Sequence, residues 1–160
     1  MQQANLEDLD PGRDPADIIR ALTGIRRDPR AVDARHILAL LDHSAPEVRV
    51  AALGLLFVEW RVALHRDRAT SMLREDPNDE VRAAAAYATV ATSSEGTRSS
   101  DVGVLLTSVE SDPSPEVRRA AYEGLLLTFQ RPDFPDALKD FNPSVDIDWE
   151  WIQELRMLWT

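Results

Sequence analysis

The chain has 160 residues, of which 44% are hydrophobic and 29% are charged, and its formal net charge is −10. This size and composition are typical of a single globular domain rather than of a disordered chain. The negative charge argues against binding to nucleic acid, which needs clustered lysines and arginines, and the lack of cysteine excludes disulfides, thiolate nucleophiles and cysteine-ligated zinc.

No apolar run approaches the roughly 18 residues that a membrane-spanning helix needs. The first residues, Met1 to Asp8, lack the basic start and apolar stretch of a secretory signal. We therefore expect a cytoplasmic protein that does not contact membranes.

The first predicted helix covers residues 14–27, after residues 1–12, which we expect to be disordered as chain termini commonly are. The stretch from Asp14 to Leu22 is an imperfect copy of a motif that recurs three times further along the chain. An array of repeats needs a polar outer face at each end. We therefore interpret this helix as an N-terminal cap.

Three segments are nearly identical: residues 45–52, 78–85 and 114–121 each contain a Glu-Val-Arg triplet followed by small residues. The glutamates of these triplets, Glu47, Glu80 and Glu116, stand 33 and 36 residues apart. A period of this size is typical of stacked helical hairpins. We therefore expect an all-α fold, an α–α superhelix of about three helix pairs with a capping helix at each end.

Each repeat is predicted to contain a first helix, a short turn and a second helix that opens at the triplet. Asp76-Pro77 and Asp112-Pro113 end the first helices, because the residue before a proline is disfavoured in the α conformation. Asn78 and Ser114 are natural N-caps for the second helices. The triplet glutamates then lie in the first turn, where capping and the helix dipole account for them without a binding role.

The first helices are predicted at residues 31–41, 61–74 and 102–109, within repeats at about 31–60, 61–92 and 100–130. Together with the caps they form a single domain over residues 13–160. The helix at residues 61–74 concentrates basic residues, which could bind an acidic partner or a phosphate but which we expect on a solvated outer face. These residues are Arg61, His65, Arg66, Arg68 and Arg74.

The C-terminal cap is predicted at residues 131–160. Residues 145–151 alternate with a period of two, as a strand would, but the spacing of Trp149, Ile152, Leu155 and Trp159 favours a helix that begins near Asp148. Five of the ten aromatic residues lie in this stretch. Tryptophan is common at binding hot spots, although packing of the cap would explain most of these rings.

The pattern Asp-Pro-x-x-Glu-Val-Arg-x-Ala-Ala resembles the short HEAT repeats of phycobilisome-lyase-type proteins and of many small bacterial proteins, over about residues 31–130. The resemblance implies a ladder in which the aspartate of the turn pairs with the arginine of a second helix, often in the adjacent repeat. The matching residues are Asp76, Asp112, Arg49, Arg82 and Arg118. In the first repeat His43 stands where the aspartate is expected, and Asp42 is a candidate substitute.

Proteins with such repeats include scaffolds, chaperone-like factors, bilin lyases, an iron hydroxylase and a DNA glycosylase, so the fold does not choose a function. The hydroxylase type holds iron with His-Glu pairs, whereas His36, His43 and His65 have no glutamate beside them. No phosphate-binding loop, dinucleotide fingerprint or nucleophile elbow is present. We expect no metal, no cofactor and no enzymatic activity.

The second helices of such arrays commonly line the surface where partners dock. Two columns of positions on them do not repeat, and one such column contains Tyr87 and Glu123 while the other contains Arg119. A surface adapted to one partner would vary in this way, and so would unconstrained drift. With Trp149 and Trp151, these residues form our predicted contact set.

We predict a non-enzymatic scaffold that binds another protein, which the negative charge predicts to be basic, with an inhibitor or immunity-type protein as one concrete form. A bilin-lyase-like or chaperone-like factor is the alternative, and a DNA-repair protein is disfavoured by the charge. The protein is expected to be a monomer or to associate weakly with itself, since an incompletely capped array can stack end to end.

Overall fold

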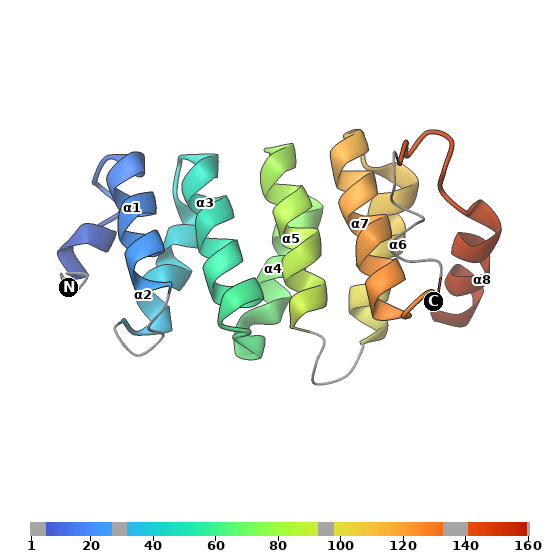
Figure 1. Cartoon of the computed structure of the whole chain (residues 1–160), viewed down its shortest axis with the longest axis horizontal. Helices are drawn as coiled ribbons and strands as arrows, with labels where there is room; N and C mark the ends of the chain where they lie inside the picture. The colour runs from blue at the N-terminus through green and yellow to red at the C-terminus, as the bar shows by residue number, and fades with distance from the viewer. Residues whose placement is uncertain (1–5, 27–31, 93–97, 133–140, 160) are drawn as a thin grey trace.

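The computed structural model describes residues 6–26, 32–92, 98–132 and 141–159. Within these ranges the chain forms helices and turns and no strand, which confirms the predicted all-α fold. The helices stand side by side in a row from the N-terminal to the C-terminal end (Figure 1). No helix of the described residues is long and apolar enough to cross a membrane.

The row has two layers. The front layer in Figure 1 contains α1 (Pro15–Ile25), α3 (Pro46–Leu53), α5 (Asp79–Ala91) and α7 (Pro115–Thr128). Behind it lie α2 (Ala34–Ala39), α4 (Arg66–Glu75) and α6 (Ser99–Ser111), and α8 (Trp149–Trp159) closes the C-terminal end. The front layer therefore contains the three predicted second helices and the predicted N-terminal cap.

The second helices begin where the sequence predicts. The side chain of Asn78 accepts a hydrogen bond from the backbone N–H of Val81 at 3.0 Å, which caps α5. Ser114 occupies the N-cap position of α7, but its hydroxyl donates to the carboxylate of Glu116 rather than capping the helix. The Glu-Val-Arg triplet thus lies in the first turn of each of these helices.

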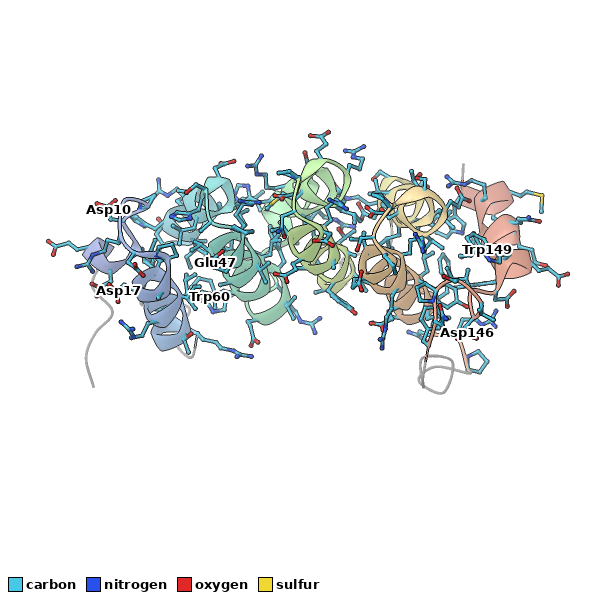
Figure 2. All side chains as sticks on the ribbon, turned by 90° about the horizontal axis from the view of Figure 1, so that it is seen from above. Asp10, Asp17, Glu47, Trp60, Asp146 and Trp149 are labelled. Carbon is cyan, nitrogen blue, oxygen red and sulfur yellow. The ribbon has the colours of Figure 1, made fainter. Side chains whose placement is uncertain are left out.

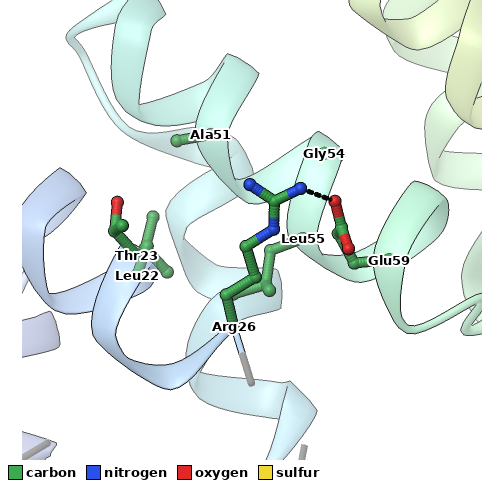
Figure 3. A pocket seen from close by; sticks show the side chains of 7 residues that line it. All are labelled: Leu22, Thr23, Arg26, Ala51, Gly54, Leu55 and Glu59. Atoms are coloured by element: carbon green, nitrogen blue, oxygen red, sulfur yellow. Dashed lines mark hydrogen bonds and ion pairs between the residues drawn. The ribbon is translucent and has the colours of Figure 1, made fainter. Parts of the chain in front are cut away.

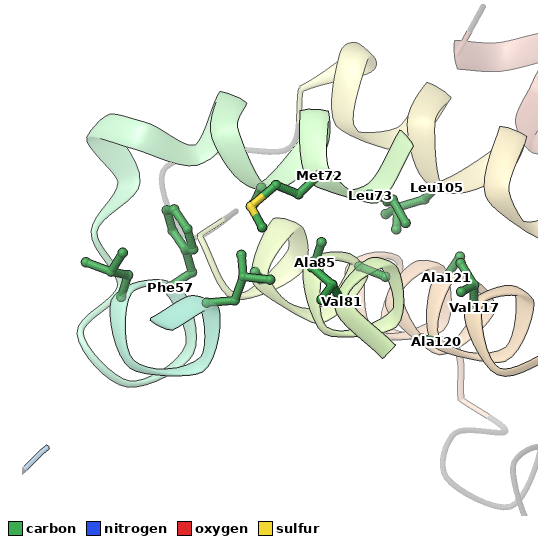
Figure 4. Packing of buried hydrophobic residues seen from close by; sticks show 14 of the residues in the cluster. Phe57, Met72, Leu73, Val81, Ala85, Leu105, Val117, Ala120 and Ala121 are labelled. Carbon is green, nitrogen blue, oxygen red and sulfur yellow. The ribbon is translucent and has the colours of Figure 1, made fainter. Parts of the chain in front are cut away.

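The core lies between the two layers. The valines of the three triplets, Val48, Val81 and Val117, are completely buried, and burial of such a side chain contributes about 1.5–3 kcal/mol. In Figure 4, Val81 and Ala85 of α5 point toward Met72 and Leu73 of α4. Small residues at the neighbouring positions let the helices of adjacent repeats approach closely.

The boundaries of the first helices differ from the prediction. In the first repeat α2 ends at Ala39 and continues as a 3-10 turn, Leu40–Asp42. The helix predicted at residues 61–74 begins only at Arg66, after a second 3-10 turn at Ala63–His65. In the third repeat α6 is longer than predicted, from Ser99 to Ser111.

The late start of α4 follows from how α3 ends. After α3 the chain widens into a π-helical segment, Gly54–Glu59, and the N–H of Trp60 donates to the carbonyl of Leu55 at 3.0 Å. Arg61 then takes a left-handed conformation with φ of 52°. An arginine in this conformation cannot open a right-handed helix.

The sequence analysis places Arg66 on a solvated face, but in the structure Arg66 is buried inside the protein. Its guanidinium donates to the carboxylate of Asp101 in α6, and both side chains are almost completely buried. The sequence prediction failed because the two partners are 35 residues apart. This ion pair joins the first helices of the second and third repeats.

Residues 1–12 are expected from the sequence to be disordered; residues 1–5 lie outside the described part, and residues 6–12 make contacts with the first repeat. Leu6–Leu9 form a 3-10 turn, and Leu9 is buried in the core. The carbonyl of Pro11 accepts a hydrogen bond at 3.0 Å from Nε2 of His43. The N-terminal segment is therefore packed against the first repeat.

The C-terminal cap is held by aromatic packing. The ring of Tyr122 in α7 stacks on Phe141 with centroids 5.3 Å apart, and its hydroxyl accepts a hydrogen bond from the N–H of Asp148. The carboxylate of Asp148 in turn accepts from the N–H of Trp151, so that α8 starts as predicted. α8 itself packs against α6.

Candidate protein-interaction surface

Two rungs of an Asp–Arg ladder join the repeats. Arg49 donates two hydrogen bonds to the carboxylate of Asp76, from Nη2 at 2.7 Å and from Nε at 2.9 Å. Arg82 donates to the carboxylate of Asp112 in the same way, from Nε at 2.8 Å and from Nη2 at 3.0 Å. These hydrogen bonds raise the pKa of Arg82 above its ordinary value. All four side chains are mostly buried. Each arginine thus binds the turn of the following repeat.

Arg82 and Arg118 also donate hydrogen bonds to backbone carbonyls in the turns of their own repeats. Nη1 of Arg82 donates to the carbonyl of Asp76 at 3.0 Å, and Nη1 of Arg118 donates to the carbonyl of Asp112 at 2.9 Å. Among the described residues, no carboxylate pairs with Arg118. These arginines, like the aspartates that they bind, have a structural role.

The first repeat has no Asp–Arg rung. Arg20 of α1, the helix before this repeat, pairs instead with Asp17 of the same helix. His43 makes different contacts: Nδ1 accepts from the N–H of Ala45 at 3.0 Å, and Nε2 donates to Pro11. Asp42, the candidate substitute, pairs instead with Arg68 near the surface.

Three of the predicted contact residues meet on the front layer. The hydroxyl of Tyr87 in α5 donates to one carboxylate oxygen of Glu123 in α7, and Nε of Arg119 donates to the other oxygen at 2.8 Å. Glu123 is largely shielded, whereas Tyr87 and Arg119 are exposed. Burial and the neighbouring carboxylate raise the pKa of Tyr87 above its ordinary value.

The surface beside this cluster has small side chains. The position of α3 equivalent to Tyr87 is Gly54, and a Cβ there would meet nothing within 4 Å. Val50 and Ala83, which are equivalent to Arg119, are partly exposed. We call the exposed side of α1, α3, α5 and α7 the second-helix face. Tyr87 and Arg119 project from it over shallow neighbours.

One edge of the second-helix face is acidic. Four exposed carboxylates lie in the first turns of α3, α5 and α7, and none of them forms an ion pair within the described ranges. They are Glu47, Asp79, Glu80 and Glu116. We call this set the acidic edge. Because the repeats stack in register, the edge runs along the row of helices.

A groove lies between α1 and the end of α3, at the N-terminal end of this face. It has a volume of about 300 Å³ and an apolar floor that includes Leu22, Ala51 and Leu55. An ion pair between Arg26 and Glu59 crosses it (Figure 3). The sequence analysis missed this groove, because its two sides come from α1 and from the end of α3, which are separated in the chain by α2.

The two predicted tryptophan contacts have different surroundings. The ring of Trp151 packs edge-on against Tyr122 and Phe129, and the guanidinium of Arg131 lies 4.8 Å above it. Trp151 therefore belongs to the packing of the cap and is no longer a candidate contact. Trp149 is 43% exposed, but it lies on α8 and not on the second-helix face.

The described residues contain no group of three or more histidine, cysteine, aspartate or glutamate side chains placed to hold a metal ion. His43 is occupied by its two backbone contacts, and His36 lies on the exposed side of α2. The surface is thus described by hydrogen bonding, charge and shape.

Stacked helix pairs that are joined by buried Asp–Arg ion pairs define an α-solenoid, a class of repeat protein in which each repeat contacts its neighbours. The family model for HEAT repeats matches residues 34–126, more than half of the chain. The chain therefore belongs to the HEAT-repeat family, whose members generally serve as protein-interaction scaffolds. Comparisons with curated proteins and with solved structures gave no match.

Proposed function

We propose that the chain is a non-enzymatic protein-interaction module whose second-helix face binds one protein partner. The observation that carries the proposal is the cluster of Tyr87, Arg119 and Glu123, which joins two helices on that face. Tyrosine and arginine are enriched at binding hot spots. Here both are held in place by one shielded carboxylate, so little side-chain entropy is lost on binding.

The charge of the chain supports a basic partner. The net charge is −10, and four of the carboxylates form the acidic edge of the second-helix face. Complementary charge speeds encounter and selects among partners more than it adds affinity. An inhibitor or immunity-type protein that neutralises a basic protein is the concrete form of this proposal.

The alternative that the family resemblance allows, a bilin-lyase-like or chaperone-like factor, has no feature of the described surface in its favour. A tetrapyrrole adduct would change the visible absorption spectrum when bilin or haem is mixed with the protein. An unchanged spectrum is the result that we expect from a protein-binding module.

The test is capture of partners from a lysate of the native host by the tagged protein, followed by titration of the purified partner. Tyr87→Ala is expected to weaken binding more than about 30-fold if Tyr87 is a hot spot. Replacing the acidic edge by Gln and Asn is expected to slow association and to reduce its dependence on salt. Circular dichroism checks that each variant keeps its helices.

The matched control is Leu64→Ala, because Leu64 is 86% exposed and lies in the turn before α4, away from the second-helix face. A basic protein that binds the parent and Leu64→Ala but not Tyr87→Ala supports the proposal. Equal binding of the partner to the parent, Leu64→Ala and Tyr87→Ala would show that the binding site lies on another surface. A partner that is acidic would contradict the role of the charge.

A further inference from the structure

The side chain of Arg118 is anchored like those of Arg49 and Arg82. In each of the three arginines, Nη1 donates to the carbonyl of the residue six positions earlier, at 2.8 Å for Arg49, 3.0 Å for Arg82 and 2.9 Å for Arg118. Nη1 also lies 3.1 to 3.5 Å from the next carbonyl along the chain. Because Nη1 is bound in the same way, the guanidinium of Arg118 is oriented on its turn as in the two rungs of the ladder.

The opposite edge of this guanidinium has no partner among the described residues. In Arg49 and Arg82 the edge formed by Nε and Nη2 donates two hydrogen bonds to the aspartate of the following repeat. In Arg118 neither Nε nor Nη2 donates a hydrogen bond to any group of the described ranges. Arg118 is also partly exposed. It therefore ends the ladder with two parallel donors that no described residue uses.

The aspartate that would complete this rung has another role. Asp148 follows Asp112 by 36 residues, the interval that also separates the two aspartates of the ladder. Its carboxylate accepts a hydrogen bond from the N–H of Trp151 at 3.0 Å and pairs with Arg131 at 3.3 Å. Asp148 therefore starts α8 and is not bound to Arg118.

The neighbouring acid at this end of the row is also engaged. Figure 2 views the row from above, and Asp146 lies near its C-terminal end, in the segment before α8. The carboxylate of Asp146 accepts a hydrogen bond from the backbone N–H of Asn142 at 2.7 Å. The described part of the chain therefore provides no carboxylate for Arg118.

A second copy of the chain does not match the site either. If two copies stacked head to tail in register, the turn of the first repeat would face Arg118, and this turn has His43 where later turns have aspartate. Both ring nitrogens of His43 already bind backbone groups, and Asp42 pairs with Arg68. These contacts favour a carboxylate from a different protein.

We propose that Nε and Nη2 of Arg118 bind one carboxylate of a different protein, from an aspartate or glutamate side chain, and so complete a third rung between two molecules. A guanidinium binds a carboxylate through two parallel hydrogen bonds, as Arg49 and Arg82 do within the chain. Since Nη1 already holds the side chain, little of its conformational freedom is lost on binding. Binding at this site does not depend on the function proposed for the second-helix face.

The probe is a blocked tripeptide with the sequence of residues 76–78, Asp-Pro-Asn. It carries a single carboxylate, because the net charge of −10 repels ligands that carry several. Titration at constant ionic strength is followed through the Nε–H signals of the arginines in NMR spectra. We expect the Arg118 signal to shift and saturate, and the signal of Arg74, on the exposed side of α4, to stay unchanged. The tripeptide Asn-Pro-Asn should bind about tenfold more weakly or not at all, because it lacks the charge-assisted hydrogen bonds.

Arg118→Lys tests the fork, since lysine keeps the charge but cannot make two parallel hydrogen bonds. Binding of the Asp-Pro-Asn tripeptide, followed through the backbone N–H signals of the first turn of α7, should weaken about tenfold. Arg74→Lys is the matched control and should bind the tripeptide like the parent. Backbone spectra of the unbound variants that match the parent show that both variants fold.

Three results would overturn the proposal. The first is an Arg118 signal that does not shift, or equal binding of the two tripeptides. The second is an Arg118 signal that shifts with protein concentration alone, since a second copy would then be the ligand. The third is an Arg118 signal that changes without any probe when Asp133, Asp136 and Asp140, which lie outside the described residues, are replaced by Asn. In that case the chain itself would fill the site.

Discussion

His43 replaces an aspartate of the repeat by dividing two tasks between its two ring nitrogens. In later repeats Asp76 and Asp112 accept a hydrogen bond from the N–H two residues on, at 3.0 and 2.9 Å, and also bind an arginine. In His43, Nδ1 accepts the equivalent bond, which leaves the proton on Nε2. That proton is donated to Pro11, where the aspartates have their arginine.

We expect His43→Ala to release the N-terminal segment. The change leaves the N–H of Ala45 and the carbonyl of Pro11 without their partners, which costs about 1–3 kcal/mol for a shielded polar group. Hydrogen exchange of residues 6–13 should become faster, and the free energy of unfolding should fall.

The control for His43 is His36→Ala, because His36 lies on the exposed side of α2. A surface change of this kind alters stability by less than about 0.5 kcal/mol. If residues 6–13 exchange equally slowly in His43→Ala, the imidazole does not hold this segment in place.

The second prediction at this scale concerns the rung between Arg82 and Asp112. Arg82→Ala leaves a largely buried carboxylate without its ion pair, and removal of one partner of a buried pair costs about 3–5 kcal/mol. Arg82→Lys should recover only part of this loss, since an ammonium group cannot make the two-pronged contact. Urea unfolding of the parent, Arg82→Ala and Arg82→Lys gives the free energy of unfolding of each protein.

Arg74→Ala, on the exposed side of α4, is the comparison for a lost surface arginine. It should leave the free energy of unfolding nearly unchanged. A lysine variant as stable as the parent would show that charge alone, without the fork geometry, holds the repeats together.

At the scale of the helices, the close packing of α7 against α5 and α6 depends on a single glycine, Gly124. In α7 a Cβ on Gly124 would lie 2.9 Å from a methyl group of Val90 in α5 and 3.4 Å from Leu105 in α6. Valine is stiff at χ1 and cannot move this methyl group aside easily. In α6, by contrast, a Cβ on Gly103 meets nothing within 4 Å. Close packing therefore requires a glycine at position 124 but not at position 103.

Gly103→Ala should stabilise the protein by about 0.5–1 kcal/mol, the difference in helix propensity. Gly124→Ala gains the same propensity but forces α7 away from α5, and overpacking of this kind costs about 1–3 kcal/mol. We therefore expect thermal unfolding to shift upward for Gly103→Ala and downward for Gly124→Ala. An upward shift for both would mean that the α5–α7 contact is not tight.

The whole molecule is a row in which each helix pair contacts its neighbours, so its two ends are energetically separate. Phe129, the C-cap residue of α7, connects the C-terminal cap to the third repeat: the centroid of its ring lies 6.2 Å from that of Trp151 and 5.5 Å from that of Trp159, both edge-on. Such aromatic contacts contribute about 0.5–1.5 kcal/mol beyond the area they bury.

Phe129→Ala should let the cap unfold before the repeats. Three of the four tryptophans lie in α8, so a Trp60→Phe background makes fluorescence a reporter of the cap alone. In that background the fluorescence and circular-dichroism transitions in urea should coincide. With Phe129→Ala added, the fluorescence midpoint should move to lower urea. Transitions that shift together would contradict independent unfolding of the cap.

Much of the architecture could be predicted from the sequence because it depends on neighbours in the chain. The Asp-Pro turns, the cap at Asn78 and the helical spacing of buried valines all act within one or two turns of helix. The same reasoning was wrong at Arg61, where the widened end of α3 sets the backbone. Nor could it predict the contact between His43 and Pro11, which are 32 residues apart.

The candidate contact residues were found only in part, because their arrangement depends on contacts between repeats. Tyr87 and Glu123 were identified as a column that does not repeat, but the bond between them joins residues 36 positions apart. Trp149 and Trp151 were identified together, and only the packing of Trp151 on Phe129 separates their roles. Position in the sequence does not reveal which side of the cap a ring faces.

By itself the sequence determined the repeat period, the all-helical fold and the acidic character of the chain, since composition and local helix signals are properties of short segments. Only the tertiary structure decided that Arg66 is buried on Asp101, that Tyr87, Arg119 and Glu123 form one cluster, and that Trp151 is packed while Trp149 is exposed. The physical reason is distance along the chain: burial and pairing arise between helices that are about one repeat apart or more, where no local pattern reports them.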